Sequence, residues 1–143
     1  TRVRRLMPEC SAASLEKISN TELRQAGLSF RKIEYARGLA AAILAGRFNP
    51  KSLSTVDDEE AISQITSLRG FGQWSAEIYL MFSLGRTDIF PADDLALQVA
   101  LGRLKGLKER PTASLARQLV SHWSPWRSAG AIFLWHYYKE TPG

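Results

Sequence analysis

The stretch from Leu68 to Trp74 constrains the fold more than any other part of this sequence. It reads Leu-Arg-Gly-Phe-Gly-Gln-Trp and lies between two runs in which apolar residues recur at helical spacing. The glycines at positions 70 and 72 tolerate positive φ angles and leave the backbone uncovered by side chains. A Gly-apolar-Gly turn between two amphipathic runs predicts a tight helix–hairpin–helix at about residues 62–84.

Helical periodicity continues through the rest of the chain, whereas strand patterns are nearly absent. The pattern predicts about eight helices, at residues 12–18, 20–26, 29–46, 58–67, 73–84, 93–103, 112–122 and 126–139. Glycine and proline mark several boundaries, for example Gly46 and Pro50 after the third helix and Pro91 before the sixth. We therefore predict an all-α fold, and the length of 143 residues favours a single domain over residues 1–143.

The composition narrows the class of protein. Lysine and arginine number 19 against 14 aspartate and glutamate residues, a net charge of +5 that suits a nucleic-acid partner but is common elsewhere. Cys10 is the single cysteine, which excludes a disulfide framework and a four-cysteine iron–sulfur cluster within the chain. We find no apolar run long enough for a membrane span and no secretion signal. We expect an intracellular protein, in the cytoplasm and nucleoid or in the nucleus.

The hairpin has a candidate role in binding a DNA phosphate. Its outward backbone N–H groups lie beside the positive end of the following helix, and both favour an anion. The amides of Gly70 and Gly72 would hold the phosphate, with Ser75 within reach, in a contact that is independent of base sequence. A plain turn whose glycines permit close packing is the more frequent explanation of Gly-x-Gly alone.

Two adjacent carboxylates, Asp93 and Asp94, follow the hairpin after a helix of about four turns and a short connection. Both lie at the start of a predicted helix, where an aspartate often caps the free N–H groups. Adjacent helical positions diverge by about 100°. We therefore expect one carboxylate to cap the helix and the other to point into a cleft, and the spacing does not decide which.

The sequence contains four tryptophans, of which Trp74 has a candidate binding role. A tryptophan is usually a largely buried residue, but Trp74 lies directly after the hairpin, where the helix is still near the surface. Its indole face is suited to receive an extruded base, and cation–π attraction of roughly 2 kcal/mol would favour a positively charged base. The two histidines, His122 and His136, form no metal-binding pattern.

Together, these motifs resemble the helix–hairpin–helix DNA glycosylase superfamily, and more closely its 3-methyladenine DNA glycosylase II branch, which removes alkylated bases. The matching stretches are residues 68–76, 90–94 and 123–128, with Trp135 beyond them and residues 26–32 with Tyr35 upstream. The likeness extends over residues 7–139. Each motif alone would be weak, and their common order and separation make the resemblance specific. It implies a helical bundle of the glycosylase type.

The resemblance implies roles for individual residues. Asp94, the second aspartate of Pro-Ala-Asp-Asp, falls on the family's catalytic carboxylate. Trp74 falls where bifunctional members carry a lysine that forms a Schiff base, so a monofunctional enzyme without lyase activity is implied. Trp74 and Trp135 would line the base pocket. The branch often has a tyrosine at the position of Ile78, and here the tyrosine is next door at Tyr79.

The resemblance also implies contacts to the DNA backbone and to a cation. The DNA-contacting segment would comprise Gly70, Phe71, Gly72, Gln73 and Ser75. The family's hairpin commonly holds a monovalent cation, Na+ or K+, through backbone carbonyls, which here would be those of Thr66, Leu68 and Phe71. No other cofactor is required. Family members normally carry further helices upstream, including the residue that fills the gap left by an extruded base, so a missing segment or a second chain would complete the N-terminal lobe.

The implied activity is hydrolysis of the N-glycosidic bond of alkylated purines, of the 3-methyladenine type, in base excision repair. The partner would be double-stranded DNA with a flipped damaged base. An ionised Asp94 in a poorly solvated cleft would stabilise the oxocarbenium-like sugar and orient water. Three alternatives stay open: a non-catalytic helix–hairpin–helix module that only binds DNA, a glycosylase for oxidised or mismatched bases, and an all-α structural domain with a chance Gly-x-Gly.

Overall fold

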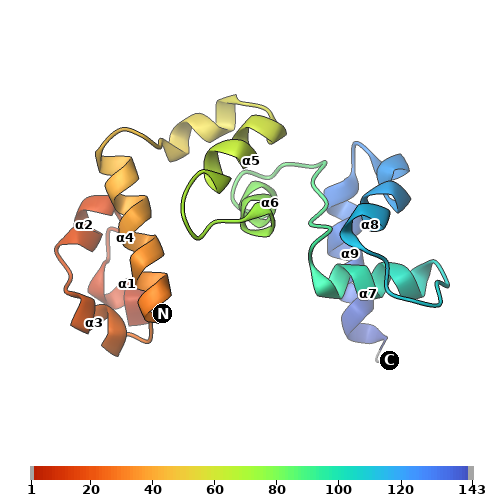
Figure 1. The fold of residues 1–143 in the computed structure, drawn as a ribbon, viewed down its shortest axis with the longest axis horizontal. Coiled ribbons are helices and arrows are strands. Elements are labelled where there is room, and N and C mark those ends of the chain that lie inside the picture. The colour runs from red at the N-terminus through yellow and green to blue at the C-terminus, as the bar shows by residue number, and fades with distance from the viewer. Residues whose placement is uncertain (1, 142–143) are drawn as a thin grey trace. The chain divides into compact units, whose positions relative to one another are not determined.

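The computed structural model describes residues 2–141, and within this range helices are joined by turns and loops without a strand (Figure 1). The predicted all-α class is confirmed. The α-helices are α1 Arg2–Leu6, α2 Ala12–Glu16, α3 Asn20–Gln25, α4 Phe30–Leu44, α5 Asp58–Thr66, α6 Gln73–Phe82, α7 Leu95–Leu104, α8 Ala113–Leu119 and α9 Arg127–Glu140; the short 3-10 helices are η1 Pro50–Thr55 and η2 Ser121–Trp123. No helix among these residues is long and apolar enough to cross a membrane.

The predicted helices agree with the structure, except that two short helices were not predicted and one helix begins later than predicted. Helix α1 and the 3-10 helix η1 were not expected from the pattern. The latter is started by Asn49, whose side chain accepts a hydrogen bond from the N–H of Lys51, with a proline at the first helical position. The helix predicted over 93–103 begins only at Leu95, because Asp94 has extended backbone angles and serves as its N-cap.

The chain packs as two compact units. The first comprises the residues up to Asp57 together with Gln64–Phe71, and the second comprises Asp58–Ser63 together with the residues from Gly72 onward. The chain passes from one unit to the other more than once, so neither unit is a continuous stretch of the sequence. The single domain expected over residues 1–143 therefore stays a prediction.

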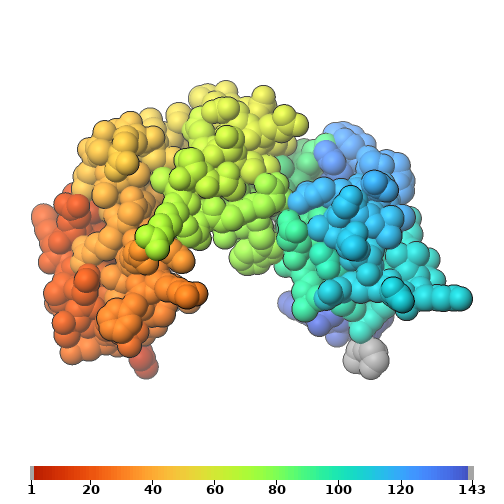
Figure 2. Space-filling model, in the orientation of Figure 1, coloured from red at the N-terminus to blue at the C-terminus, as the bar shows by residue number. Residues whose placement is uncertain are grey.

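The first unit is organised around α4, which packs against α2 and α3 (Figure 1). In the space-filling view the atoms of these helices, coloured red to orange, form one closely packed group (Figure 2). Its apolar core consists of Leu15, Ile18, Leu23, Ile33 and Ala40. Arg37 of α4 donates hydrogen bonds to the carbonyls of Leu15, at 2.6 Å, and of Ile18, so it attaches α4 to the end of α2 and the turn that follows.

The second unit is organised around α7 and α9, which pack against each other and cross in this view (Figure 1). The helices α6, α7 and α9 all carry side chains with no exposed surface, namely Ala76, Leu80, Leu97, Ala100, Leu101, Ala131 and Leu134. Complete burial of one leucine contributes about 1.5–3 kcal/mol. Gly130 of α9 lies against Trp123, since a Cβ atom there would come within 2.4 Å of the indole ring. The start of α6 and the start of α7, which carry the candidate site, both belong to this unit.

Two polar anchors attach the connection between α6 and α7 to the start of α9. The carboxylate of Asp88 accepts hydrogen bonds from both Nε, at 2.7 Å, and Nη2, at 2.9 Å, of Arg127, and from the Ser124 hydroxyl at 2.7 Å. The buried Ser128 hydroxyl accepts from the N–H of Ile89 at 2.9 Å. The hydrogen bonds from Arg127 are the main reason that the pKa of Asp88 falls from 3.8 to about 2.

We expect Asp88→Asn to lower the free energy of unfolding by about 1 kcal/mol at pH 7, a figure reduced for the partial exposure of both partners. A depressed carboxyl pKa contributes stability that is complete above the unfolded value of 3.8 and is lost as the pH falls through about 2. Urea denaturation of both proteins from pH 7 to pH 2 should show the difference shrinking below pH 4. Glu16→Gln, at an exposed position of α2, serves as a control that should show no such trend. A constant difference over that range would contradict the assignment.

Candidate active site

Asp94 lies at the entrance to α7, where the chain turns after the connection from α6. Its backbone N–H donates to the carbonyl of Pro91 at 2.9 Å, which closes the turn. Its Oδ1 atom accepts from the N–H of Leu97 at 3.0 Å and so caps the helix. The Asp94 side chain is half-buried. A helix start of this kind holds the carboxylate in one orientation.

Two indole rings donate hydrogen bonds to the same carboxylate. The Nε1–H group of Trp74 donates to Oδ2 at 3.0 Å, and that of Trp135 donates to Oδ1 at 3.3 Å. Trp74 is the second residue of α6 and is 46% exposed, whereas Trp135 on α9 is half-buried. The structure therefore brings together Asp94, Trp74 and Trp135, three residues that the sequence had singled out. The indole N–H groups are occupied by Asp94, so the ring faces are the parts left for a ligand.

Phe82 adds a third aromatic ring that the sequence analysis missed. Its ring centroid lies 5.7 Å from that of Trp135 with an interplanar angle of 32°, and its side chain is 62% exposed. Trp74, Ile78 and Phe82 are spaced four residues apart on α6 and share one face of the helix. This spacing was the available signal. Ile78 and Tyr79 are both half-buried, and Tyr79, one position on, turns by about 100° from that face.

The prediction that the two aspartates have separate roles at the start of this helix was wrong. We expected one carboxylate to cap the helix and the other to point into a cleft, but Asp94 both caps α7 and contacts the two indoles. One carboxylate suffices because its two oxygens offer about four acceptor positions. The Asp93 side chain is 50% exposed and instead forms an ion pair with Arg117, Nη2 to Oδ2, at 3.3 Å.

The arrangement suits a reaction in which positive charge develops next to a carboxylate. The carboxylate is anchored by three hydrogen bonds from three directions, so it needs little reorganisation when a cationic centre forms beside it. The exposed face of Trp74 and the ring of Phe82 offer flat apolar surfaces near it. Such surfaces bind planar and preferably cationic ring systems.

The two glycines of the hairpin have different roles. Gly70 has φ +91°, and a Cβ atom there would come within 2.3 Å of the Tyr35 ring, so both its conformation and its surroundings require glycine. Gly72 has an extended backbone with φ −93° and open space around it, so the freedom to adopt a positive φ is used at Gly70 and not at Gly72. Gly72 is the N-cap of α6 and has no side chain to cap the first N–H groups of Gln73 to Ser75.

The carbonyl groups expected to hold a cation lie in the first unit. Thr66 is the last residue of α5, and Leu68 and Phe71 follow in the turn. The carbonyl of Leu68 accepts a hydrogen bond from the N–H of Phe71 at 3.2 Å, which leaves its second lone pair for another contact. Neutral carbonyl oxygens at the negative end of a helix fit a hard monovalent cation. The cation itself stays a prediction.

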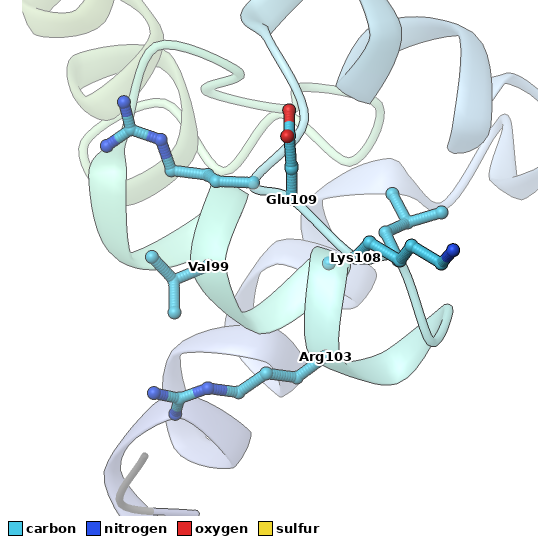
Figure 3. A pocket seen from close by; sticks show the side chains of 7 residues that line it. Val99, Arg103, Lys108 and Glu109 are labelled. Carbon is cyan, nitrogen blue, oxygen red and sulfur yellow. The ribbon is translucent and has the colours of Figure 1, made fainter.

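A separate pocket lies at the opposite end of α7, about ten residues and 15 Å along the helix from Asp94. It is lined by Val99, Gly102, Arg103, Leu107, Lys108, Glu109 and Arg110. Its basic side chains do not converge, since Arg103 and Lys108 point away from each other (Figure 3). With no indole and a single acidic side chain among its lining residues, it lacks the features of the Asp94 site.

The capping role of Asp94 predicts how substitutions affect stability. We expect Asp94→Ala to lower the free energy of unfolding by about 1 kcal/mol, because the first N–H groups of α7 lose their acceptor. Asp94→Asn should lower the free energy of unfolding by only a few tenths of 1 kcal/mol, since asparagine is about as good an N-cap residue as aspartate. Urea denaturation of the two variants at pH 7 measures the difference. Equal stability of the alanine and asparagine variants would show that the cap contributes little.

Comparison with known proteins identifies relatives of this chain by sequence and by fold. The chain is 34% identical over 114 residues to DNA-3-methyladenine glycosylase 1 of Schizosaccharomyces pombe, covering 79% of this chain and 50% of the relative. Its fold matches a crystal structure of a DNA-3-methyladenine glycosidase from Bacillus halodurans with a TM-score of 0.83 and 32% identity, over 96% of this chain and 64% of that one.

A second solved structure, the Schizosaccharomyces pombe 3-methyladenine DNA glycosylase in complex with abasic DNA, matches with a TM-score of 0.80 and 30% identity, over 87% of this chain and 61% of that one. The chain spans about half the length of the curated relatives it matches, 42% and 50% for two of them. The model of the HhH-GPD superfamily of base excision DNA repair proteins matches residues 1–125. The chain therefore belongs to the HhH-GPD superfamily.

Proposed function

We propose that this chain carries the base-excising site of a DNA glycosylase that hydrolyses the N-glycosidic bond of alkylated purines. The observation that carries the proposal is the Asp94 carboxylate, held at the start of α7 between the indoles of Trp74 and Trp135. The relatives named above as DNA-3-methyladenine glycosylases support the choice of substrate class. Double-stranded DNA is the partner in this proposal.

The reaction needs little beyond positioning and charge stabilisation. N-alkylation places a positive charge on the purine, so the base leaves with the electron pair of the C1′–N bond without prior protonation. The nucleotide is first flipped out of the duplex, at a cost of a few kcal/mol that is smallest for a damaged base. The indole face of Trp74 and the ring of Trp135 then hold the cationic base.

Asp94 acts on the sugar after the base begins to leave. The deoxyribose becomes oxocarbenium-like as the C1′–N bond breaks, and the carboxylate stabilises that positive charge. A water molecule adds its oxygen to C1′, and its proton passes to the carboxylate and then to solvent. The products are the free base and an abasic site in an unbroken strand.

The backbone around the hairpin supplies the grip on DNA in this proposal. The N–H groups of Gln73 to Ser75 at the start of α6 point out of a helix that has no side-chain cap, which suits a phosphate. Gly70 and Phe71 complete the predicted DNA-contacting segment. The carbonyls of Thr66, Leu68 and Phe71 would hold Na+ or K+ in this proposal, as the resemblance to the glycosylases implies.

Asp94→Asn should abolish base release while DNA binding is kept. The amide still caps α7 but carries no charge to stabilise the sugar, so we expect the single-turnover rate of 3-methyladenine release to fall by at least about 100-fold. Affinity for a duplex with an abasic-site analogue, measured by fluorescence anisotropy, should change little. The control is Asp93→Asn, at the neighbouring carboxylate, which should reduce the rate of base release less than Asp94→Asn does. Near wild-type release by Asp94→Asn would remove Asp94 from the reaction.

The enzyme should leave the DNA strand intact. Trp74 stands where a lysine would be needed as the covalent nucleophile, and an indole nitrogen cannot form a Schiff base with the sugar. We expect methylated duplex to be cut only after alkali treatment, and no protein–DNA adduct to form with borohydride. A bifunctional glycosylase treated in parallel provides the positive control. A borohydride-trapped adduct of this chain would contradict the monofunctional assignment.

A further inference from the structure

Arg117 of α8 contacts the turn that precedes Asp94, at residues Phe90 and Asp93. Its Nη1 donates to the carbonyl of Phe90 at 3.3 Å, and its Nη2 donates to the Asp93 carboxylate at 3.3 Å. The same Nη2 donates to Oε1 of Glu77 on α6 at 3.2 Å. One planar guanidinium thus joins three acceptors that come from α6 and from both ends of the Phe90–Asp93 turn.

Glu77 is the anchor of this contact. It is a carboxylate with 2% of its surface exposed, and its Oε2 atom has no hydrogen-bond partner in the part of the chain that the structure describes. Burial raises the pKa of the Glu77 carboxyl, and the Gln73 side chain and the Arg117 guanidinium oppose that rise. A buried carboxylate is costly and tends to be kept only with a charged partner. This cost makes Arg117 hard to displace from its position.

The turn has a second tether on the side of α7. Gln98 donates from Nε2 to the carbonyl of Ala92 at 2.7 Å. Pro91 and Ala92 between the tethers are buried. The backbone of the turn is therefore held at Phe90, at Ala92 and through the Asp93 side chain, while the Asp94 carboxylate faces the two indoles.

We infer that Arg117, anchored by the buried Glu77, is a positioning residue that sets the turn so that Asp94 reaches both Trp74 and Trp135. The geometric part stands on the contacts above, and its consequence for catalysis rests on the proposed function. A displacement of about 1 Å at a reacting group can cost about 100-fold in rate. Arg117 would therefore affect the rate of the chemical step without touching the DNA.

The test uses Arg117→Gln with two independent measurements. The first is the NMR signal of each indole Nε1–H group in the free protein, assigned with Trp74→Phe and Trp135→Phe. We expect the Trp74 and Trp135 signals to shift in Arg117→Gln, because their acceptor moves, while that of Trp126, which is 63% exposed, stays in place. The second is base release under single turnover, expected to fall by about 10- to 100-fold.

DNA affinity separates positioning from a direct DNA contact. A positioning residue leaves the dissociation constant and its salt dependence nearly unchanged. Loss of a phosphate contact would weaken binding and lower the slope of log affinity against log salt by about 0.9. That result, together with an unchanged rate of base release, would overturn the inference in favour of a DNA ligand.

Two further variants address folding and charge. If Arg117→Gln unfolds because Glu77 is left unpaired, the double variant Glu77→Gln with Arg117→Gln removes the buried charge and is measured instead. Arg117→Lys keeps the charge but not the planar fork and should recover little of the rate. Arg103→Gln is the matched control, since Arg103 also donates to a carbonyl, that of Thr141, but lies at the far end of α7. It should leave all four indole signals near their wild-type positions.

The two measurements keep the inference and the proposed function apart. If the wild-type chain releases no alkylated base, the proposed function fails, and the indole signals still decide whether Arg117 positions Asp94. Unchanged Trp74 and Trp135 signals in a folded Arg117→Gln or double variant would overturn the inference, whatever the activity of the wild type.

Discussion

The Asp94 carboxylate accepts hydrogen bonds from three helices of the second unit. It receives a backbone N–H from its own helix, at Leu97, and indole N–H groups from α6 and α9. Each donor belongs to a helix that also carries a fully buried leucine, namely Leu97 on α7, Leu80 on α6 and Leu134 on α9. The carboxylate can accept all three because each oxygen has two lone pairs. A single side chain thus fixes a helix start and the orientation of two aromatic rings.

This arrangement separates the polar and the apolar demands of the site. The indole N–H groups point to the carboxylate, which leaves the ring faces free of hydrogen-bonding needs and suited to stacking. The exposed Phe82 ring extends the apolar surface beside Trp135. A cationic planar base gains from both parts, since the rings attract its charge and the carboxylate attracts the charge that develops on the sugar.

Polar contacts attach the connection from α6 to α7 to other helices, although this connection has no regular secondary structure. Asp88 is tied to Arg127, Ile89 to Ser128, and the Phe90 carbonyl to Arg117. These contacts satisfy backbone and side-chain groups that a loop would otherwise expose or leave unpaired. The buried Glu77 carboxylate is paired with Arg117, and it would be left without this charged partner if Arg117 moved away.

The sequence by itself determined the features that depend on neighbours along the chain. Periodicity predicted the long helices, the Gly-Phe-Gly turn predicted the hairpin, and Pro91 with Asp93 and Asp94 predicted a helix start, because helix formation and capping involve residues only a few positions apart. The resemblance to the glycosylases singled out Asp94, Trp74 and Trp135. The sequence pattern left open which aspartate caps the helix, and it gave no sign that Glu77 pairs with Arg117.

Tertiary structure decided those points because they depend on residues that are distant in sequence. Glu77 and Arg117 are 40 positions apart in the sequence, and Asp94 and Trp135 are 41 positions apart. Whether a carboxylate on a helix is solvated or buried depends on what packs over it, and a one-dimensional pattern does not contain that. Gly70 is a further example. Its positive φ favours glycine, and the Tyr35 ring leaves no space for a Cβ atom, whereas Gly72 has open space around it.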